Sequence, residues 1–134
     1  MFFSLPETPY GASFSKPQIL KKPLENILQK TPSFTCISTT EARELIEAND
    51  VTLLDVRDLA SFTASNIENS IHVSDRNVEQ IVASADKDQP LLVYCYHGNS
   101  SKGAADYFFR EGFTKSYSID GGFEDWRLKY PVSS

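Results

Sequence analysis

Cysteine is scarce in this chain of 134 residues, which contains only Cys36 and Cys95. The two lie far apart in sequence and form neither a C-x-x-C pair nor a Cys/His spacing that binds metal, so no metal site is expected. A single disulfide between them is conceivable, but the sequence around Cys95 suits a free thiolate. A reducing compartment is therefore the better interpretation.

Long apolar runs are absent, and none approaches the ~20 residues that a membrane helix needs. The N-terminus also lacks the basic region followed by an apolar region that marks a secretory signal. We therefore expect a cytoplasmic protein with no membrane partner. Positive charge is limited as well, because 13 Lys and Arg face 18 Asp and Glu, for a net charge of −5. A nucleic-acid surface needs clustered cations, so no nucleic-acid partner is expected.

Prolines are concentrated at one end of the chain, with five of the seven in the first 32 residues. Residues 1–33 show no sustained hydrophobic period and are predicted to form an irregular N-terminal extension, with one or two helical turns around residues 24–28. Two alternatives remain open: a floppy tail, or a segment whose apolar residues pack on the domain or on a partner. These apolar residues are Phe2, Phe3, Leu5, Tyr10 and Phe14. Four lysines against two glutamates give the extension a charge of +2, which leaves −7 for residues 34–134.

From Phe34 onward, short apolar or β-branched runs alternate with segments of helical pattern. Ser38 with Glu41 forms a capping box that starts one helix, and Asp58 is placed to cap another. Strands that alternate with helices indicate βαβ units, and hence an α/β domain with a mostly parallel sheet covered on both faces. The expected strands cover 34–37, 51–56, 71–73, 91–94 and 117–119, and the expected helices cover 40–48, 59–64, 77–85, 101–111 and 123–129.

The segment around Cys95 is the most informative part of the chain. The apolar run 91–94 ends in Cys95, a polar loop containing Gly98 follows, and a helical segment begins near Ser101. Free backbone N–H groups and the positive end of a helix dipole both favour an anion at such a position. Sites in parallel sheets also form at the carboxyl ends of strands. Cys95 is therefore predicted to be a thiolate nucleophile.

Three segments together resemble the rhodanese family. They are residues 94–105 (YCYHGNSSKGAA), residues 117–126 (YSIDGGFEDW) and residues 54–58 (LDVRD), the last being similar to the family's D-x-R signature. The resemblance covers residues 34–131 and is strongest to the small single-domain bacterial thiosulfate sulfurtransferases of the GlpE type. It implies a three-layer α/β/α fold with a five-stranded, mostly parallel sheet, in a rhodanese domain spanning residues 34–134.

The resemblance also implies a reaction. Cys95 would attack the outer sulfur of thiosulfate, release sulfite and keep a persulfide, which a second nucleophile then takes. The implied acceptors are cyanide or a thiol, with reduced thioredoxin as one example. No metal or other cofactor is needed, because backbone N–H groups around the sulfur would hold the negative charge. The persulfide-binding loop would consist of Tyr96, His97, Gly98, Asn99, Ser100, Ser101 and Lys102.

Supporting roles are expected for residues near this loop. Asp55 and Arg57 are interpreted as an ion pair that orients the loop, with direct substrate contact as the less favoured alternative. For His97 a hydrogen-bonding role is favoured over general-base catalysis, because a thiolate of low pKa needs no base. Cys36, at the end of an expected strand, is interpreted as a buried or idle thiol.

The loop is poor in basic residues. Many larger rhodaneses have cations where this chain has Tyr96 and Ser100, whereas the GlpE type shares the basic-poor loop. Lys102 is then the only cation near Cys95 in sequence, so thiosulfate is expected to bind weakly. Ser100 and Ser101 are expected to add hydroxyl donors and to cap the following helix.

Two other functions remain to be weighed. A cysteine phosphatase needs an Arg six positions after its nucleophile to grip the phosphoryl oxygens, but Ser101 stands there and no Arg follows before Arg110. That alternative is therefore poor. The second is a module that relays sulfur from a protein persulfide or docks a partner. It stays open, because the retained Cys95 suits sulfur transfer without selecting the donor or the acceptor.

Overall fold

A computed structural model describes residues 33–134 of the chain. The strands are β1 (Thr35–Ile37), β2 (Thr52–Asp55), β3 (Ile71–His72), β4 (Leu91–Tyr94) and β5 (Ser116–Ile119). The helices are α2 (Thr39–Ala48), α3 (Leu59–Ala64), α4 (Val78–Ser84), α5 (Ser100–Arg110) and α6 (Gly122–Lys129). Apart from Ser33, the expected extension with its helical turns and apolar residues lies outside the described residues. The domain boundary at Phe34 therefore stays a prediction.

The five strands form one sheet in the order β1-β5-β4-β2-β3, and all of its strand pairs are parallel. β4 lies at the centre, where Val93 is in register with Ser118 of β5 and with Leu54 of β2. Parallel strands need crossover connections, and here helices supply them. The expected α/β class is confirmed, and within the described residues this sheet is wholly parallel.

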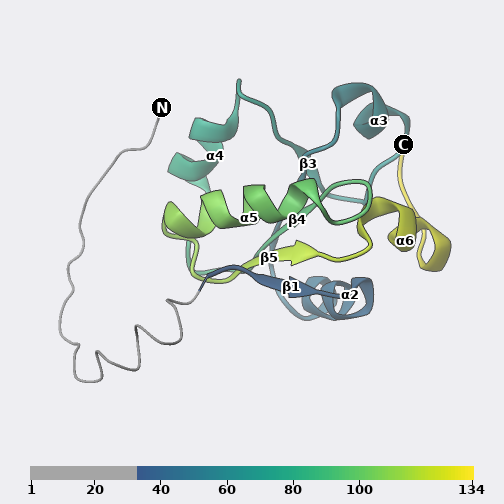
Figure 1. The fold of residues 1–134 in the computed structure, drawn as a ribbon, viewed down its shortest axis with the longest axis horizontal. Helices are drawn as coiled ribbons and strands as arrows, with labels where there is room; N and C mark the ends of the chain where they lie inside the picture. The colour runs from purple at the N-terminus through teal and green to yellow at the C-terminus, as the bar shows by residue number, and fades with distance from the viewer. Residues whose placement is uncertain (1–32) are drawn as a thin grey trace, which may run out of the picture. The chain divides into compact units, whose positions relative to one another are not determined.

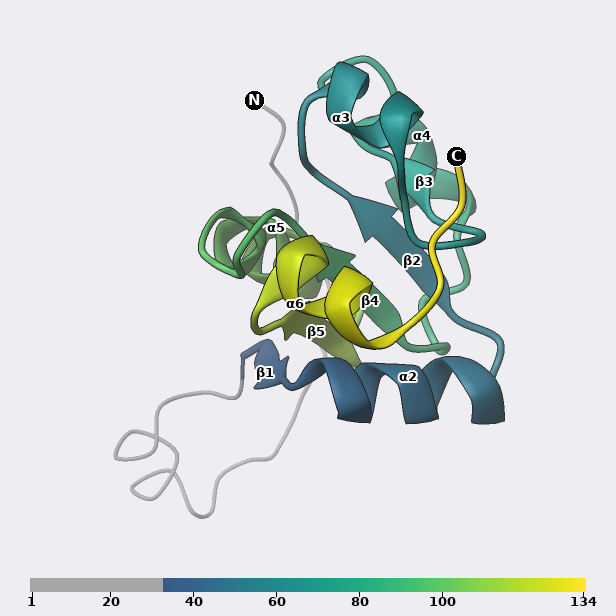
Figure 2. The ribbon, with the colours of Figure 1, turned by 90° about the vertical axis from the view of Figure 1, so that its right-hand side faces the viewer.

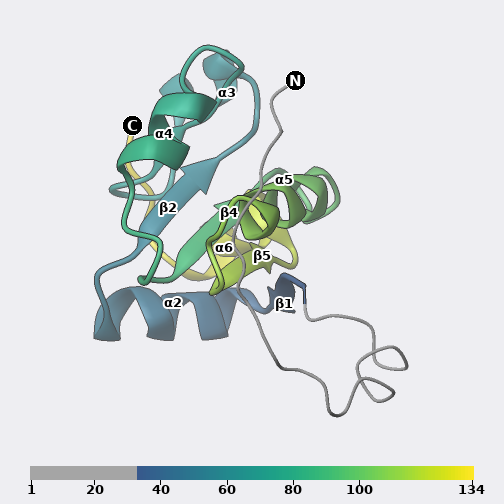
Figure 3. The same cartoon turned by 90° about the vertical axis from the view of Figure 1, so that its left-hand side faces the viewer.

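Two hydrophobic cores, one on each face of the sheet, join the three layers. Side chains alternate along β4, so Leu92 packs with Trp126 of α6 and with α2, whereas Val93 packs with Phe108 of α5 and with α4. Figure 1 and Figure 3 show α2 and α5 on opposite sides of the sheet. Figure 2 shows α6 in front of β4 and β5, and its Trp126 packs in the same core as α2. Complete burial of one such side chain contributes ~1.5–3 kcal/mol, so the two cores supply the main stabilising term.

Local sequence signals start two helices as expected. The Ser38 hydroxyl accepts a hydrogen bond from the Glu41 N–H, and the Glu41 carboxylate accepts one from the Ser38 N–H, which confirms the capping box of α2. Asp58 caps α3 by accepting a hydrogen bond from the N–H of Ser61. α5 begins at Ser100, one residue earlier than expected. None of the helices in the described part of the chain is long and apolar enough to cross a membrane.

Candidate active site around Cys95

Three adjacent strands bring the candidate residues to one edge of the sheet. Cys95 directly follows β4, Arg57 lies just beyond β2, and Gly122 lies just beyond β5. β4 lies between β2 and β5, and all three run in the same direction, so their carboxyl ends meet. The three segments that carry the family resemblance therefore form one site, although the sequence separates them widely.

The sulfur of Cys95 lies in a nest of hydrogen-bond donors. The residue is only 4% exposed. The backbone N–H groups of Gly98 and Ser101 donate to Sγ over N···S distances of 3.2 and 3.3 Å. Sγ also lies 3.4 Å from the hydroxyl oxygen of Ser101. Because α5 begins at Ser100, the Ser101 N–H is one of the free donors at a helix N-terminus, where negative charge is favoured.

Burial and hydrogen bonding act in opposite directions on the ionisation of Cys95. Burial favours the neutral thiol. Against it act the side-chain hydrogen bond between Cys95 and Ser101 and then the backbone N–H groups of Ser101, Gly98 and His97. The net effect lowers the pKa of Cys95 below its usual value. A thiolate is therefore the favoured reactive form of this buried side chain.

Cys36 has the opposite character. It is exposed, so of the two expected descriptions, buried or idle, only the idle thiol remains. Partial burial of its sulfur and then the nearby carboxylate of Asp120 raise the pKa of Cys36. Cys95 is thus the more readily ionised of the two cysteines.

The hydroxyl of Ser101 contacts the Cys95 sulfur and does not cap α5. The N-cap of α5 is Asn99, and no side-chain hydrogen bond caps this helix, so the expected capping by Ser100 and Ser101 is wrong. Instead, the fully buried Ser101 hydroxyl lies 3.4 Å from Cys95 Sγ and 2.8 Å from the hydroxyl oxygen of Ser118 in β5. Sequence reasoning missed Ser118. Its signal was a small polar residue in a strand that a parallel sheet buries on both faces.

Two glycines let the Cys95 loop lie directly against the segment that follows β5. Gly122 has a φ of 56°, and a Cβ there would lie 2.5 Å from the carbonyl oxygens of both Cys95 and Tyr96. The same carbonyls accept hydrogen bonds of 2.8 and 3.0 Å from the next two N–H groups of α6. Gly98 has a φ of 101°, and its Cβ would lie 3.0 Å from the nitrogen of Gly121. Only glycine adopts such φ values without strain, so both positions fix the shape of the loop.

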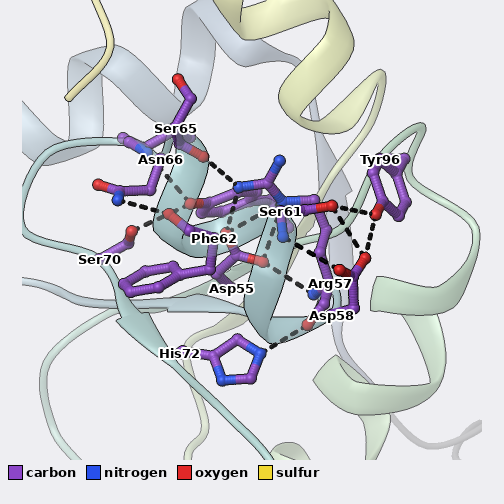
Figure 4. Close-up of polar contacts among 12 residues, drawn as sticks. Asp55, Arg57, Asp58, Ser61, Phe62, Ser65, Asn66, Ser70, His72 and Tyr96 are labelled. Atoms are coloured by element: carbon purple, nitrogen blue, oxygen red, sulfur yellow. Dashed lines mark hydrogen bonds and ion pairs between the residues drawn. The ribbon is translucent and has the colours of Figure 1, made fainter. Parts of the chain in front are cut away.

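Asp55, the last residue of β2, and Arg57, just beyond it, form the expected ion pair (Figure 4). Arg57 Nη2 lies 2.7 Å from Asp55 Oδ2, and the two side chains are 3% and 0% exposed. The guanidinium also donates to the carbonyl of Ser65 and lies 4.1 Å from the ring centroid of Phe123 in α6. Burial opposes its charge, but the hydrogen bonds to Asp55 prevail and raise the pKa of Arg57. The guanidinium is thus enclosed by protein groups.

Tyr96 connects the Cys95 loop to the start of α3 (Figure 4). Its hydroxyl donates a short hydrogen bond to the carboxylate of Asp58 and lies 2.5 Å from the hydroxyl oxygen of Ser61. The hydrogen bonds from Tyr96 and then from Ser61 lower the pKa of Asp58 to about 2. The Arg57 guanidinium lies 5.6 Å from the Tyr96 ring centroid. Sequence reasoning assigned Asp58 only a capping role and did not anticipate this second contact.

The other predicted loop residues lie on the solvent side of the site. His97, Asn99, Ser100 and Lys102 are exposed, and their side chains make no hydrogen bond with other residues in the range 33–134. The hydrogen-bonding role expected for the His97 side chain is therefore not seen, whereas its backbone N–H acts on Cys95. Across the same range, no group of three or more His, Cys, Asp or Glu residues is arranged to hold a metal ion.

Known proteins share both this sequence pattern and this fold. The rhodanese-like domain family matches residues 38–129. Thiosulfate sulfurtransferase GlpE of Pseudomonas aeruginosa is 46% identical over 102 residues, covering 76% of this chain and 92% of that protein. Its namesake from Tolumonas auensis is 44% identical, covering 75% and 95%. The crystal structure of a rhodanese-related protein from Thermoplasma volcanium matches with a TM-score of 0.63 and 28% identity, covering 75% of this chain and 98% of that one. The resemblance is thereby confirmed: the chain belongs to the rhodanese family.

Proposed function

We propose that this protein is a thiosulfate sulfurtransferase that carries sulfur as a persulfide on Cys95. The observation that carries the proposal is the buried Cys95 sulfur, held by the N–H groups of Gly98 and Ser101 at the start of α5. Two relatives named thiosulfate sulfurtransferase, at 46% and 44% identity, support thiosulfate as the donor. Neither observation selects the acceptor.

In the first half-reaction, the Cys95 thiolate attacks the outer sulfur of thiosulfate. A bond forms between Sγ and that sulfur, the S–S bond of thiosulfate breaks, and its electron pair leaves with sulfite. The negative charge of the enzyme then resides on the outer sulfur of the persulfide. The N–H groups of Asn99 and Ser100 make no hydrogen bond within the described residues, so they remain free to hold this charge.

In the second half-reaction, an acceptor attacks the outer sulfur of the persulfide. With cyanide, a C–S bond forms, the persulfide S–S bond breaks, and Cys95 leaves as a thiolate while thiocyanate is released. A thiol such as that of reduced thioredoxin would accept the sulfur in the same manner and become a persulfide itself. Cys95 is thus both the nucleophile and the leaving group. A stabilised thiolate raises the ionised fraction in the first step and makes Cys95 the better leaving group in the second.

Other residues support this chemistry from a distance. Asp55 and Arg57 act as positioning residues. Their charges are paired and buried, and the Arg57 guanidinium packs on the ring of Phe123 in α6, which connects the end of β2 to the helix behind the Cys95 loop. Lys102 is exposed in the first turn of α5 and attracts the thiosulfate dianion. We place the reaction in the cytoplasm, since the mechanism requires that Cys95 stay reduced.

Mass spectrometry of the intact protein tests the proposal directly. After incubation with thiosulfate and desalting, the protein should gain the mass of one sulfur atom, and added cyanide should remove it with formation of thiocyanate. Cys95→Ser should abolish both events, because the serine hydroxyl is a far weaker nucleophile than a thiolate. Cys36→Ser is the matched control and should leave both nearly unchanged, since the pKa of Cys36 is raised.

Two outcomes would overturn the proposal in different ways. If Cys36→Ser proved as inactive as Cys95→Ser, the single-nucleophile mechanism would have to give way to a scheme with two thiols. If thiosulfate failed to load the protein while a low-molecular-weight persulfide loaded Cys95, the donor would be wrong and a sulfur-relay module would be the better description.

A further inference from the structure

Ser118 occupies an unusual place for a hydroxyl group. It lies in β5 between Cys36 of β1 and Val93 of β4, and it is 0% exposed. Within the described residues, the Ser101 hydroxyl, 2.8 Å away, is the single hydrogen-bond partner of the Ser118 hydroxyl. A buried hydroxyl with one partner is costly unless the hydrogen bond to that partner is made. Its presence next to the site therefore calls for an explanation.

The number of protons and acceptors indicates which of the two hydroxyls, Ser101 or Ser118, donates the hydrogen bond between them. The Ser101 hydroxyl has one proton to donate, and Cys95 Sγ and Ser118 are the side-chain neighbours with which it interacts. If Ser101 donates to Ser118, the Ser118 proton has no acceptor in the surrounding described structure. If Ser118 donates to Ser101, the Ser101 proton is free to point at Cys95 Sγ, and both protons are satisfied. The second arrangement requires an acceptor at the sulfur, which the thiolate provides.

We infer that Ser118 is a positioning residue that orients the Ser101 hydroxyl toward Cys95 and thereby favours the ionised form of its sulfur. The inference deepens the proposed function and rests on it for the role of Cys95 as sulfur carrier. In the thiol state Sγ instead donates its own proton to the hydroxyl oxygen of Ser101, 3.4 Å away, and the Ser101 proton no longer points at the sulfur. Ser118 thus stabilises the thiolate form of Cys95 through the Ser101 hydroxyl, without contacting the sulfur itself.

The same chain affects the two half-reactions differently. When an acceptor removes the outer sulfur, the persulfide S–S bond breaks and its electron pair goes to Sγ, which lies 3.4 Å from the hydroxyl oxygen of Ser101. By the inference above, the Ser101 hydroxyl then donates to the developing thiolate. A leaving thiolate of lower pKa departs faster. In the loading step, the chain raises the thiolate fraction but reduces the intrinsic nucleophilicity of the sulfur, so the two effects partly cancel. Loss of Ser118 should therefore slow discharge more than loading.

Ser118→Ala tests the inference without any need for thiosulfate. The pH dependence of Cys95 alkylation by iodoacetamide should shift upward by about 0.3–0.8 pH units, because part of one hydrogen bond to the charged form is lost. Below the midpoint this corresponds to an alkylation rate about two- to sixfold lower. The matched control is Ser116→Ala, which removes another buried hydroxyl from the same face of β5, one that donates to the carbonyl of Ala105 over 2.8 Å. It should leave the midpoint unchanged.

A double-mutant cycle separates positioning from general damage. In a Ser101→Ala background the Ser118→Ala change should shift the midpoint little, because the group through which Ser118 acts is gone. Single-turnover measurements should show discharge to cyanide slowed more than loading by Ser118→Ala. An unchanged midpoint in Ser118→Ala, or the same shift with and without the Ser101 hydroxyl, would overturn the inference. Either result would leave the proposed function intact, since alkylation and sulfur loading are separate measurements.

Discussion

At the scale of single residues, the two cysteines show that exposure and reactivity need not coincide. Cys36 is exposed with a raised pKa, whereas Cys95 is buried with a lowered pKa. The thiolate is the reactive form, so the alkylation rate rises as the pH passes through each pKa and then levels off. We expect the midpoint of this rise to lie at a lower pH for Cys95 than for Cys36. Peptide mass spectrometry after timed labelling between about pH 5 and about pH 10 measures both midpoints in one sample.

The sign of this effect also sets the pH dependence of catalysis. A lowered pKa keeps the nucleophile ionised further into the acid range, so persulfide formation is lost only as the pH falls through the folded-state pKa of Cys95. An earlier midpoint for Cys36 would contradict the account, because it would mean that solvent exposure outweighs the hydrogen bonds around the Cys95 sulfur.

Lys102 is expected to act on substrate capture rather than on the thiolate. Its positive charge acts to lower the pKa of Cys36, whereas burial and hydrogen bonds set the pKa of Cys95. Lys102→Ala should therefore raise KM for thiosulfate more than it lowers kcat, and added salt should reduce the difference from the unmodified protein. Steady-state kinetics at low and high salt measure both effects. Lys115→Ala, at an exposed lysine that precedes β5 at the opposite end of the sheet, is the charge-matched control. A large fall in kcat with unchanged KM would place Lys102 in the chemical step.

At the scale of elements, the start of α6 packs directly against the backbone of the Cys95 loop. A Cβ at Gly122 would lie 2.5 Å from the carbonyl oxygens of Cys95 and Tyr96, which belong to backbone that cannot rotate away. Gly122→Ala should therefore destabilise the protein by about 1–3 kcal/mol and distort the loop. We expect most of the sulfur-transfer activity to be lost even under conditions in which the variant is still folded. Urea unfolding and the cyanide assay on the same preparation compare the two.

Gly103 provides the matched glycine control. It lies within α5, and apart from its chain neighbours and the backbone of its own helix, no atom of the described residues would lie within 4 Å of a Cβ there. Gly103→Ala should keep sulfur transfer and stabilise the protein by about 0.5–1 kcal/mol, because alanine is the better helix former. Full activity of Gly122→Ala would show that the loop does not depend on its close approach to α6.

At the scale of the whole molecule, the described residues build two hydrophobic cores, one on each face of the sheet. Phe34 packs against the core of α4 and α5, and Tyr130 packs against the core of α2 and α6. We therefore expect a truncated protein that begins at Ser33 to fold and to transfer sulfur to cyanide, a small acceptor that needs no docking surface. Thermal unfolding and the cyanide assay, each compared with the full chain, measure the outcome.

The two alternatives for residues 1–33 predict different results for this truncated protein. A tail without contacts would leave the thermal midpoint unchanged. Apolar residues that pack on the domain would give a lower midpoint after truncation, because apolar surface would become exposed. An insoluble or inactive truncated protein would show that the extension belongs to the fold and that the boundary at Phe34 is wrong.

The sequence by itself determined the features that depend on neighbouring residues. The capping box of Ser38 and Glu41, the Asp58 cap, and the apolar strand that delivers Cys95 to a loop before a helix all follow from residues a few positions apart. Such signals specify local backbone structure almost independently of the rest of the chain. They were sufficient for the parallel α/β class, and the motifs at Cys95 and Gly122 were sufficient for the family.

Only the tertiary structure decided which distant side chains meet. Ser118 touches Ser101, Tyr96 bonds to Asp58, and Gly122 underlies the loop, yet each pair comes from different elements. These contacts depend on strand order and on the direction in which each side chain leaves its element, and neither is written in local periodicity. The sequence therefore predicted Cys95 as the nucleophile, and the packing of β5 and α6 against its loop decided which groups from distant parts of the chain lie around it.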